Sequence, residues 1–139
     1  MSAVETSTIE TSALPDITLT RRDADRLDSL IDAFDLFRAG PTGTFLLNEI
    51  GRARIVDAPA APAGVVAMGS MVTFRDETGR TTTARLVYPE DAAGEGATIS
   101  ILTPGGAALL GLSEGQSISY AAPGGHRKRL TVVQVRDDA

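Results

Sequence analysis

The spacing of apolar residues changes in the middle of the chain, and this change limits the possible folds more than any other feature. Before the segment "APAAPAGVVAMG" (58–69), apolar residues recur every three or four positions, which is the period of a helix. After it they alternate with polar residues, which is the period of a strand. The segment itself combines alanine, proline and glycine, a composition typical of a linker. We therefore expect a helical unit over 16–57 and a β-rich unit over 68–136, joined by a linker over 58–67.

The helical unit is predicted to be a short antiparallel hairpin. Its first helix, over 21–38, carries apolar side chains on one face: Ala24, Leu27, Leu30, Ile31, Phe34 and Phe37. Thr20 and Asp23 have the spacing of a helix-capping pair. The segment "AGPTGT" (39–44) interrupts the pattern, and "TFLLNEIGRARIVD" predicts a second helix with Leu47, Ile50 and Ala53 on its apolar stripe. Residues 1–15, rich in threonine, serine and glutamate, are predicted to be a disordered lead-in.

The β-rich unit reads as five short strands with one short helix. "SMVTFRD" and "RTTTARLVY" flank a turn at Glu77-Thr78-Gly79 and predict a hairpin. "TISIL" predicts a third strand, "PGGAALLGL" a short helix begun by Pro104, "EGQSISYAA" a fourth strand and "HRKRLTVVQV" a fifth. Strands with a helix between the third and the fourth make the unit α+β.

Composition excludes several kinds of chemistry. The chain of 139 residues has no cysteine and one histidine, His126, which excludes disulfides, thiolate catalysis and metal sites rich in cysteine or histidine. Its net charge is −5, so overall electrostatics do not draw it to nucleic acid, and we expect no direct sequence-specific nucleic-acid binding. It shows neither a signal peptide nor an apolar run of about 20 residues, the length that spans a membrane. We expect a cytoplasmic protein without catalytic residues, metal or cofactor; a monomer is expected, although the sequence does not determine the oligomeric state.

Two polar clusters deserve a functional and a structural interpretation. Asp25, Asp28, Asp32 and Asp35 follow one helix and could hold Mg²⁺, but no second group completes such a site, so we interpret them as a solvated helix face. "PGGHRKRL" (123–130) could bind phosphate through glycine amides and basic side chains. Tight hairpin turns also require glycine, and the pattern lacks the spacing of a nucleotide-binding loop, so we interpret it as a turn that starts a basic strand. His126 lies beside this turn without a partner, and we expect it to be exposed.

The segment "ISILTPGGAALLGL" (99–112) raises a further question. Pro104 and Gly111 suit the start and the end of a short helix. Two adjacent glycines in its first turn cost helix stability, so something must compensate. Either another segment of the chain or a partner molecule approaches the backbone closely here, and the sequence leaves both possibilities open.

The short N-terminal hairpin matches a known family in layout and length rather than in motif, and four pieces within about residues 68–135 resemble the same family in their order and spacing: "GSMVTF", "ARLVYPEDA", "ISILTPGGAALLGLSEGQSISY" and "APGGHRKRLTVVQV". They are similar to the GreA/GreB transcript-cleavage factors, and within these to the Rnk group, the regulators of nucleoside diphosphate kinase. The resemblance implies a strongly bent, FKBP-like antiparallel sheet packed on a short helix. It also implies a partner, RNA polymerase, bound at the rim of its secondary channel through the corner Leu102, Thr103, Pro104 and Gly105.

The chain departs from the family pattern at two places. Leu102 stands where Gre factors usually have Asp or Asn, which removes a polar contact from the predicted docking corner. Gre factors carry two acids at the end of a long coiled coil, whereas the tip here, "RAGPTGT", has no acid. The resemblance therefore implies a non-enzymatic regulator that occupies the channel without stimulating transcript cleavage. A regulator of nucleoside diphosphate kinase acting outside the polymerase is the alternative, and a hydrolase or isomerase is disfavoured because no nucleophile, base or metal cluster is present.

Overall fold

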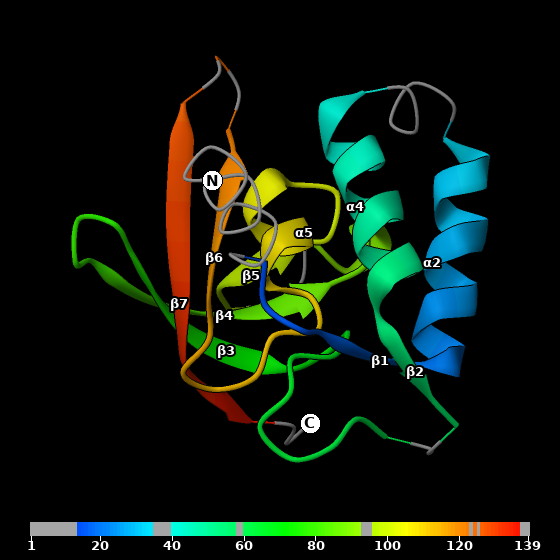
Figure 1. Ribbon diagram of the computed structural model, residues 1–139, viewed down its shortest axis with the longest axis horizontal. Coiled ribbons are helices and arrows are strands. Elements are labelled where there is room, and N and C mark those ends of the chain that lie inside the picture. Colours follow the sequence, from blue (N-terminus) through cyan, green and yellow to red (C-terminus); the bar gives the residue numbers. More distant parts are fainter. Residues whose placement is uncertain are drawn as a thin grey trace, which may run out of the picture.

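The computed structural model describes residues 14–34, 40–57, 60–92, 96–122, 124 and 126–136. The predicted lead-in therefore lies almost wholly outside the described residues. Two helices stand side by side, and a curled sheet wraps around a third, shorter helix next to them (Figure 1). The α+β class and the curled sheet predicted from the sequence are confirmed.

The first helix, α2 (Arg21–Ala33), begins as the capping pattern predicts. The side chain of Thr20 accepts a hydrogen bond from the backbone N–H of Asp23 at 3.1 Å. Leu27 and Ile31 are fully buried, whereas Phe34 is 46% exposed. The helix ends at Ala33, where the N–H of Phe34 turns back to the carbonyl of Ile31, so the predicted end at residue 38 is wrong. An apolar residue that continues the spacing does not extend a helix when its side chain lacks a surface to cover.

The second helix, α4 (Pro41–Arg52), begins earlier than predicted because Pro41 occupies its first turn, where a missing N–H costs nothing. Its buried stripe contains Leu46 and Ile50, not Leu47, which is 36% exposed. Residues after Ala53 leave the helix and form β2 (Arg54–Val56), which pairs in parallel with β1 (Thr18–Thr20). Both strands have three residues, too few to show a period in the sequence.

The main sheet has five strands in the order β5-β4-β3-β7-β6. The strands are β3 (Met71–Asp76), β4 (Thr81–Val87), β5 (Thr98–Ser100), β6 (Ser117–Ala121) and β7 (Arg127–Arg136). All predicted strands are present, and the β3–β4 turn has Gly79 at φ +88°. The pairing is antiparallel except for β4 with β5, which is parallel because a crossover containing the short 3₁₀ helix η1 (Pro89–Asp91) separates them.

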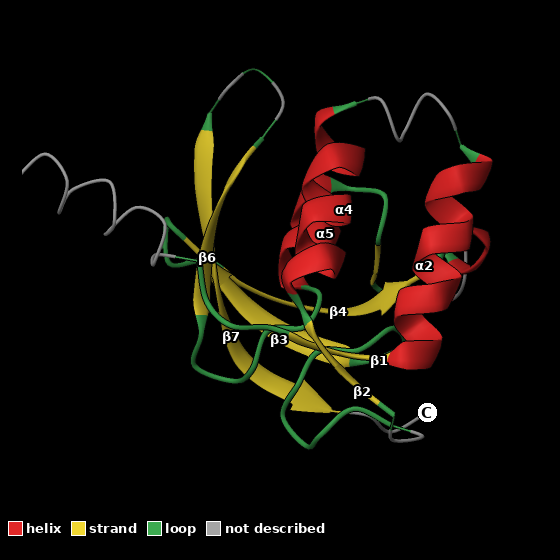
Figure 2. Ribbon diagram, turned by 45° about the vertical axis from the view of Figure 1, so that its right-hand side comes forward, coloured by secondary structure: helices red, strands yellow, loops and turns green. Residues whose placement is uncertain are grey.

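The short helix α5 (Pro104–Leu109) lies inside the curl of the sheet and contacts α4 on its other side (Figure 2). Leu109, Leu110 and Leu112 are fully buried there. Together with Leu46 from α4 and Ile17 from the N-terminal segment they belong to one continuous core. The helical hairpin and the sheet thus share a core that is centred on α5.

The segment predicted as a linker also joins this core. Val65 and Val66 are buried, and the N–H of Val66 donates to the carbonyl of Leu112 at 2.8 Å. The division at 58–67 between two units stays a prediction, but its C-terminal part is packed. Within the described residues, no helix is both long and apolar enough to cross a membrane.

Candidate docking surface

The corner before α5 is held in one conformation by its own hydrogen bonds. The hydroxyl of Thr103 donates to the carbonyl of Ser100 at 2.7 Å and accepts from the N–H of Gly106 at 3.1 Å, so it caps the helix and ties it to β5. The N–H of Leu102 donates to the Ser100 hydroxyl at 3.1 Å. Both functions of the Thr103 hydroxyl are therefore used inside the chain, and the shape of the corner does not depend on a partner.

The four residues predicted to bind a partner lie together at this corner but differ in exposure. Thr103 is exposed, while Pro104 and Gly105 are half-buried. Leu102 is also half-buried and packs against the core. The corner therefore presents Thr103, Pro104 and Gly105 outward, and Leu102 contributes partly as an anchor.

The two glycines of the first turn have different reasons to be there. A Cβ on Gly106 would lie 2.1 Å from the carbonyl oxygen of Ser100, a distance that no side chain tolerates. A Cβ on Gly105 would meet only side chains, the nearest being Ile99 at 3.4 Å, which is ordinary contact. Close approach within the chain thus explains Gly106, and the fold by itself leaves Gly105 unexplained.

The corner adjoins the start of α4, a neighbour that the sequence did not indicate. Pro104 lines a small hollow of about 50 Å³ together with Pro41 and Phe45 of α4 and Tyr120 of β6. Burial raises the pKa of the Tyr120 hydroxyl, and the charges of Glu77 and Asp76 raise it further. Because the hollow joins residues far apart in sequence, no local pattern could have predicted it.

The opposite end of α5 joins the sheet to the helical hairpin. Gly111 has φ +80°, donates its N–H to the carbonyl of Val66 at 2.9 Å and accepts the N–H of Thr18 at 3.1 Å. A Cβ here would lie 2.8 Å from the Cβ of Ile17. This glycine therefore fixes where the chain before α2 meets the end of α5.

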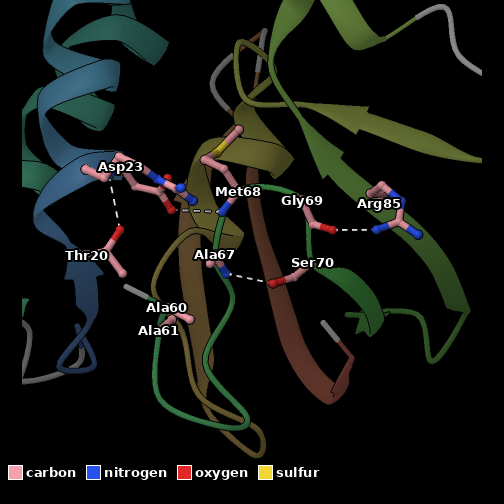
Figure 3. A pocket seen from close by; sticks show the side chains of 10 residues that line it. Thr20, Asp23, Ala60, Ala61, Ala67, Met68, Gly69, Ser70 and Arg85 are labelled. Carbon is pink, nitrogen blue, oxygen red and sulfur yellow. Dashed lines mark hydrogen bonds between the residues drawn. The ribbon is translucent and has the colours of Figure 1, made fainter. Parts of the chain in front are cut away.

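A cleft of about 390 Å³ lies between α2 and the sheet (Figure 3). Asp23, although only 5% exposed, points across it and accepts the N–H of Met68 at 3.2 Å. On the far side the guanidinium of Arg85 donates to the carbonyl of Gly69 at 2.6 Å. Asp23 and Arg85 thus both bind the backbone of residues 68–69, which favours a structural role for the cleft over a catalytic one.

Tyr88, directly after β4, contributes to the contact between α2 and the sheet. The guanidinium of Arg26 lies 3.8 Å from the centre of its ring and pairs with Glu90 at 2.6 Å. The Tyr88 hydroxyl is buried and has no hydrogen-bond partner among the described residues. Burial, reinforced by the negative charge of Asp23, raises the pKa of Tyr88 to about 12.

The other candidates from the sequence do not form a reactive cluster in the described residues. Asp25, Asp28 and Asp32 are exposed on α2, and Asp35 lies outside the described residues. His126 is exposed, as predicted. No group of three or more His, Cys, Asp or Glu in the described part of the chain could hold a metal ion.

Family models match almost the whole described chain. Residues 61–137 match the model for "Transcription elongation factor, GreA/GreB, C-term", and residues 15–56 match the model for the "Rnk N-terminus". The boundary between the two matches coincides with the change in hydrophobic period.

Similar proteins agree with these matches. The "Regulator of nucleoside diphosphate kinase" of Escherichia coli K12 is 34% identical over 122 residues, which cover 87% of this chain and 89% of that protein. The "Transcription elongation factor GreA" of Syntrophobacter fumaroxidans is 37% identical over 93 residues, covering 66% of this chain and 59% of that protein. Among solved structures, "Prokaryotic transcription elongation factor GreA/GreB from Nitrosomonas europaea" is 39% identical with a TM-score of 0.66, covering 87% of this chain and 98% of that chain.

Proposed function

The chain belongs to the GreA/GreB family, whose factors bind RNA polymerase, and we propose that it is a non-enzymatic regulator that binds this enzyme at the secondary channel through the corner at Thr103, Pro104 and Gly105. Its relatives are named as regulators or elongation factors, not as enzymes.

One observation carries the choice of surface: Gly105 is a helix-weakening residue that no internal contact requires. A side chain at this position would fit the folded chain, so the reason for glycine lies outside it. Close approach of a partner's backbone supplies such a reason. The neighbouring Pro104 and the hydrogen-bonded Thr103 are already ordered, so binding loses little conformational entropy there.

The helical hairpin supports binding without stimulation of transcript cleavage. α2 has 13 residues, which at about 1.5 Å per residue give an arm of roughly 20 Å. The described start of α4, 40–44, carries no carboxylate, and the rest of the predicted tip lies outside the described residues. Coordinating a catalytic Mg²⁺ requires oxygen ligands such as carboxylates. We infer that the protein occupies the channel entrance and competes there with Gre factors that do stimulate cleavage.

The experiment measures binding to immobilised core RNA polymerase by interferometry for the wild type and for two matched proline variants. Pro104 and Pro89 are both half-buried prolines at the start of a helix, but only Pro104 lies at the corner. We expect Pro104→Ala to weaken binding about fivefold, corresponding to about 1 kcal/mol of lost apolar contact, and Pro89→Ala to bind like the wild type.

A second readout tests the mode of action. Added wild-type protein should reduce GreA-stimulated transcript cleavage in stalled complexes and should stimulate none alone. Absence of binding at micromolar concentration contradicts polymerase binding altogether. Equal binding by both proline variants and the wild type would move the docking surface away from the corner.

A second candidate function rests on the name of the 34% identical relative, a regulator of nucleoside diphosphate kinase. In this alternative the chain regulates the level or activity of that kinase outside the polymerase. Titration calorimetry with the purified kinase separates the two: a stoichiometric complex with the kinase, together with no binding to polymerase, favours the alternative.

A further inference from the structure

On the described strands, the charged side chains on the outer face of the sheet are all positive. Strand register places the outward positions in rows, with Arg75 opposite both Thr81 and Thr131, and Arg129 opposite Ser119. The charged residues at these outward positions are Arg75, Arg85, Arg127, Arg129 and Arg136. No aspartate or glutamate occupies an outward position on the five described strands. A chain with a net charge of −5 thus presents a basic sheet face.

Three of these arginines are available to a partner. Arg75, Arg127 and Arg129 are exposed, and none forms an ion pair with a residue that the structure describes. Two acids of the β3–β4 turn adjoin this face: Asp76 accepts from the N–H of Arg80 at 3.0 Å, and Glu77 accepts from the backbone N–H of Arg129 at 3.3 Å. The carboxylates at this rim are therefore engaged with backbone donors.

Apart from Met71, Val87 and the exposed Val133, the rest of the outer face is polar or small. Hydroxyl pairs cross the strands between Thr73 and Thr83 at 2.8 Å and between Ser117 and Thr131 at 2.7 Å. No outward position on the described strands is aromatic. A protein partner needs apolar or aromatic anchors at the centre of its interface, and single-stranded nucleic acid needs aromatic rings for its bases to stack on. Guanidinium groups with hydroxyls instead match the phosphate oxygens of a nucleic-acid backbone.

We propose that the outer face of the sheet binds the phosphate backbone of double-stranded nucleic acid without sequence preference, through Arg75 near the end of β3 and Arg127 and Arg129 at the start of β7. β7 has ten residues, about 33 Å of strand, and a duplex presents one negative charge per about 1.7 Å of its axis. Several phosphates therefore face the arginines at once. This surface lies on the opposite side of the sheet from the core around α5, and the inference does not depend on binding to the polymerase.

Fluorescence anisotropy with a labelled DNA duplex tests the proposal on the full chain. We expect the wild type to bind the duplex at about 50 mM salt and to lose affinity towards about 200 mM, with a log–log slope of about −0.9 per phosphate contact, near −3 for three contacts. The variant Arg75→Gln/Arg127→Gln/Arg129→Gln should lose about tenfold in affinity at low salt and most of the salt dependence.

A matched control separates the surface from the overall charge. Arg21→Gln/Arg22→Gln/Arg54→Gln removes the same charge from exposed arginines of the helical hairpin and should bind the duplex like the wild type. Equal losses in the two triple variants, or none in the sheet variant, would overturn the proposal. Tighter binding of poly-glutamate than of the duplex, measured at equal charge and equal salt, would also overturn it, in favour of an acidic protein partner. The sheet variant should still bind RNA polymerase that has been treated with nuclease. This result would separate nucleic-acid binding by the sheet from polymerase binding by the corner.

Discussion

The two ends of α5 use glycine for different purposes. At the C-terminal end Gly111 is enclosed by Ile17, Thr18 and Val66, and every polar group of its backbone is bonded inside the chain. At the N-terminal end Gly106 is enclosed in the same way by Ser100, but its neighbour Gly105 has room for a side chain. A helix of six residues can thus be fixed at both ends and still keep one position whose identity the fold does not dictate.

The largest effect is expected at Gly106. In Gly106→Ala the new Cβ would overlap the Ser100 carbonyl oxygen, and neither backbone segment can move without breaking the Thr103 cap. We expect a loss of about 3 kcal/mol in the free energy of unfolding, measured by urea denaturation. A loss below about 0.5 kcal/mol would mean that the corner is soft, and the comparison between the two glycines would fail.

A somewhat smaller effect is expected at Gly111. Gly111→Ala combines an unfavourable positive φ with a contact of 2.8 Å to Ile17, and we expect a loss of about 2 kcal/mol. Hydrogen exchange gives the sharper readout, because the N–H of Thr18 donates to Gly111. Faster exchange at Thr18, with unchanged exchange in β3 and β7, is the expected pattern. Uniform loss of protection would show that the contact at Gly111 is not a local feature.

These two positions also show what the sequence could reveal. The end of α5 at Leu109, two residues before Gly111, and its start at Pro104 follow local rules of helix capping, so both were predictable. The reason for Gly106 was not, since it depends on the path of Ser100 after the sheet has closed. The same limit explains the missed strands β1 and β2, which form only because the shared core brings Thr18 beside Arg54.

The candidate surfaces likewise have some features that the sequence reveals and others that depend on the folded chain. The family resemblance gave the corner at Leu102–Gly105, but the adjoining hollow with Phe45 and Tyr120 required the packed hairpin. The negative net charge of the chain did not predict the positive charge on the outer face of the sheet. The alternation of "RKRLTVVQVR" places Arg127 and Arg129 on the same side, and only the register with β3 adds Arg75 to them. Residue types were readable from the sequence, and their assembly into a surface was not.

Tyr88 gives a pH-dependent test of the contact between α2 and the sheet. Its pKa is raised to about 12 in the folded chain, from an ordinary value near 10, so the folded state favours the neutral phenol. The stabilisation is fully present below pH 10 and is lost as the pH rises from about 10 to about 12. We expect Tyr88→Phe, which removes a buried hydroxyl without a partner among the described residues, to retain more of its stability than the wild type across this range. Parallel stability curves of the two proteins would place the hydroxyl in contact with water.

The smallest effect on stability, and the most informative about function, is expected at Gly105. In Gly105→Ala the added methyl meets side chains at 3.4 Å or more, so we expect a gain of about 0.5 kcal/mol from the lower entropy of the unfolded chain. The new methyl points towards Ile99, Tyr120 and Leu130, so it obstructs a partner that enters the hollow beside Tyr120, and in that case binding to core RNA polymerase should weaken about tenfold. A more stable protein that binds less tightly is the combination expected of a docking residue. Unchanged binding would leave Gly105 without a role at the corner, and the docking surface would then have to lie away from this hollow.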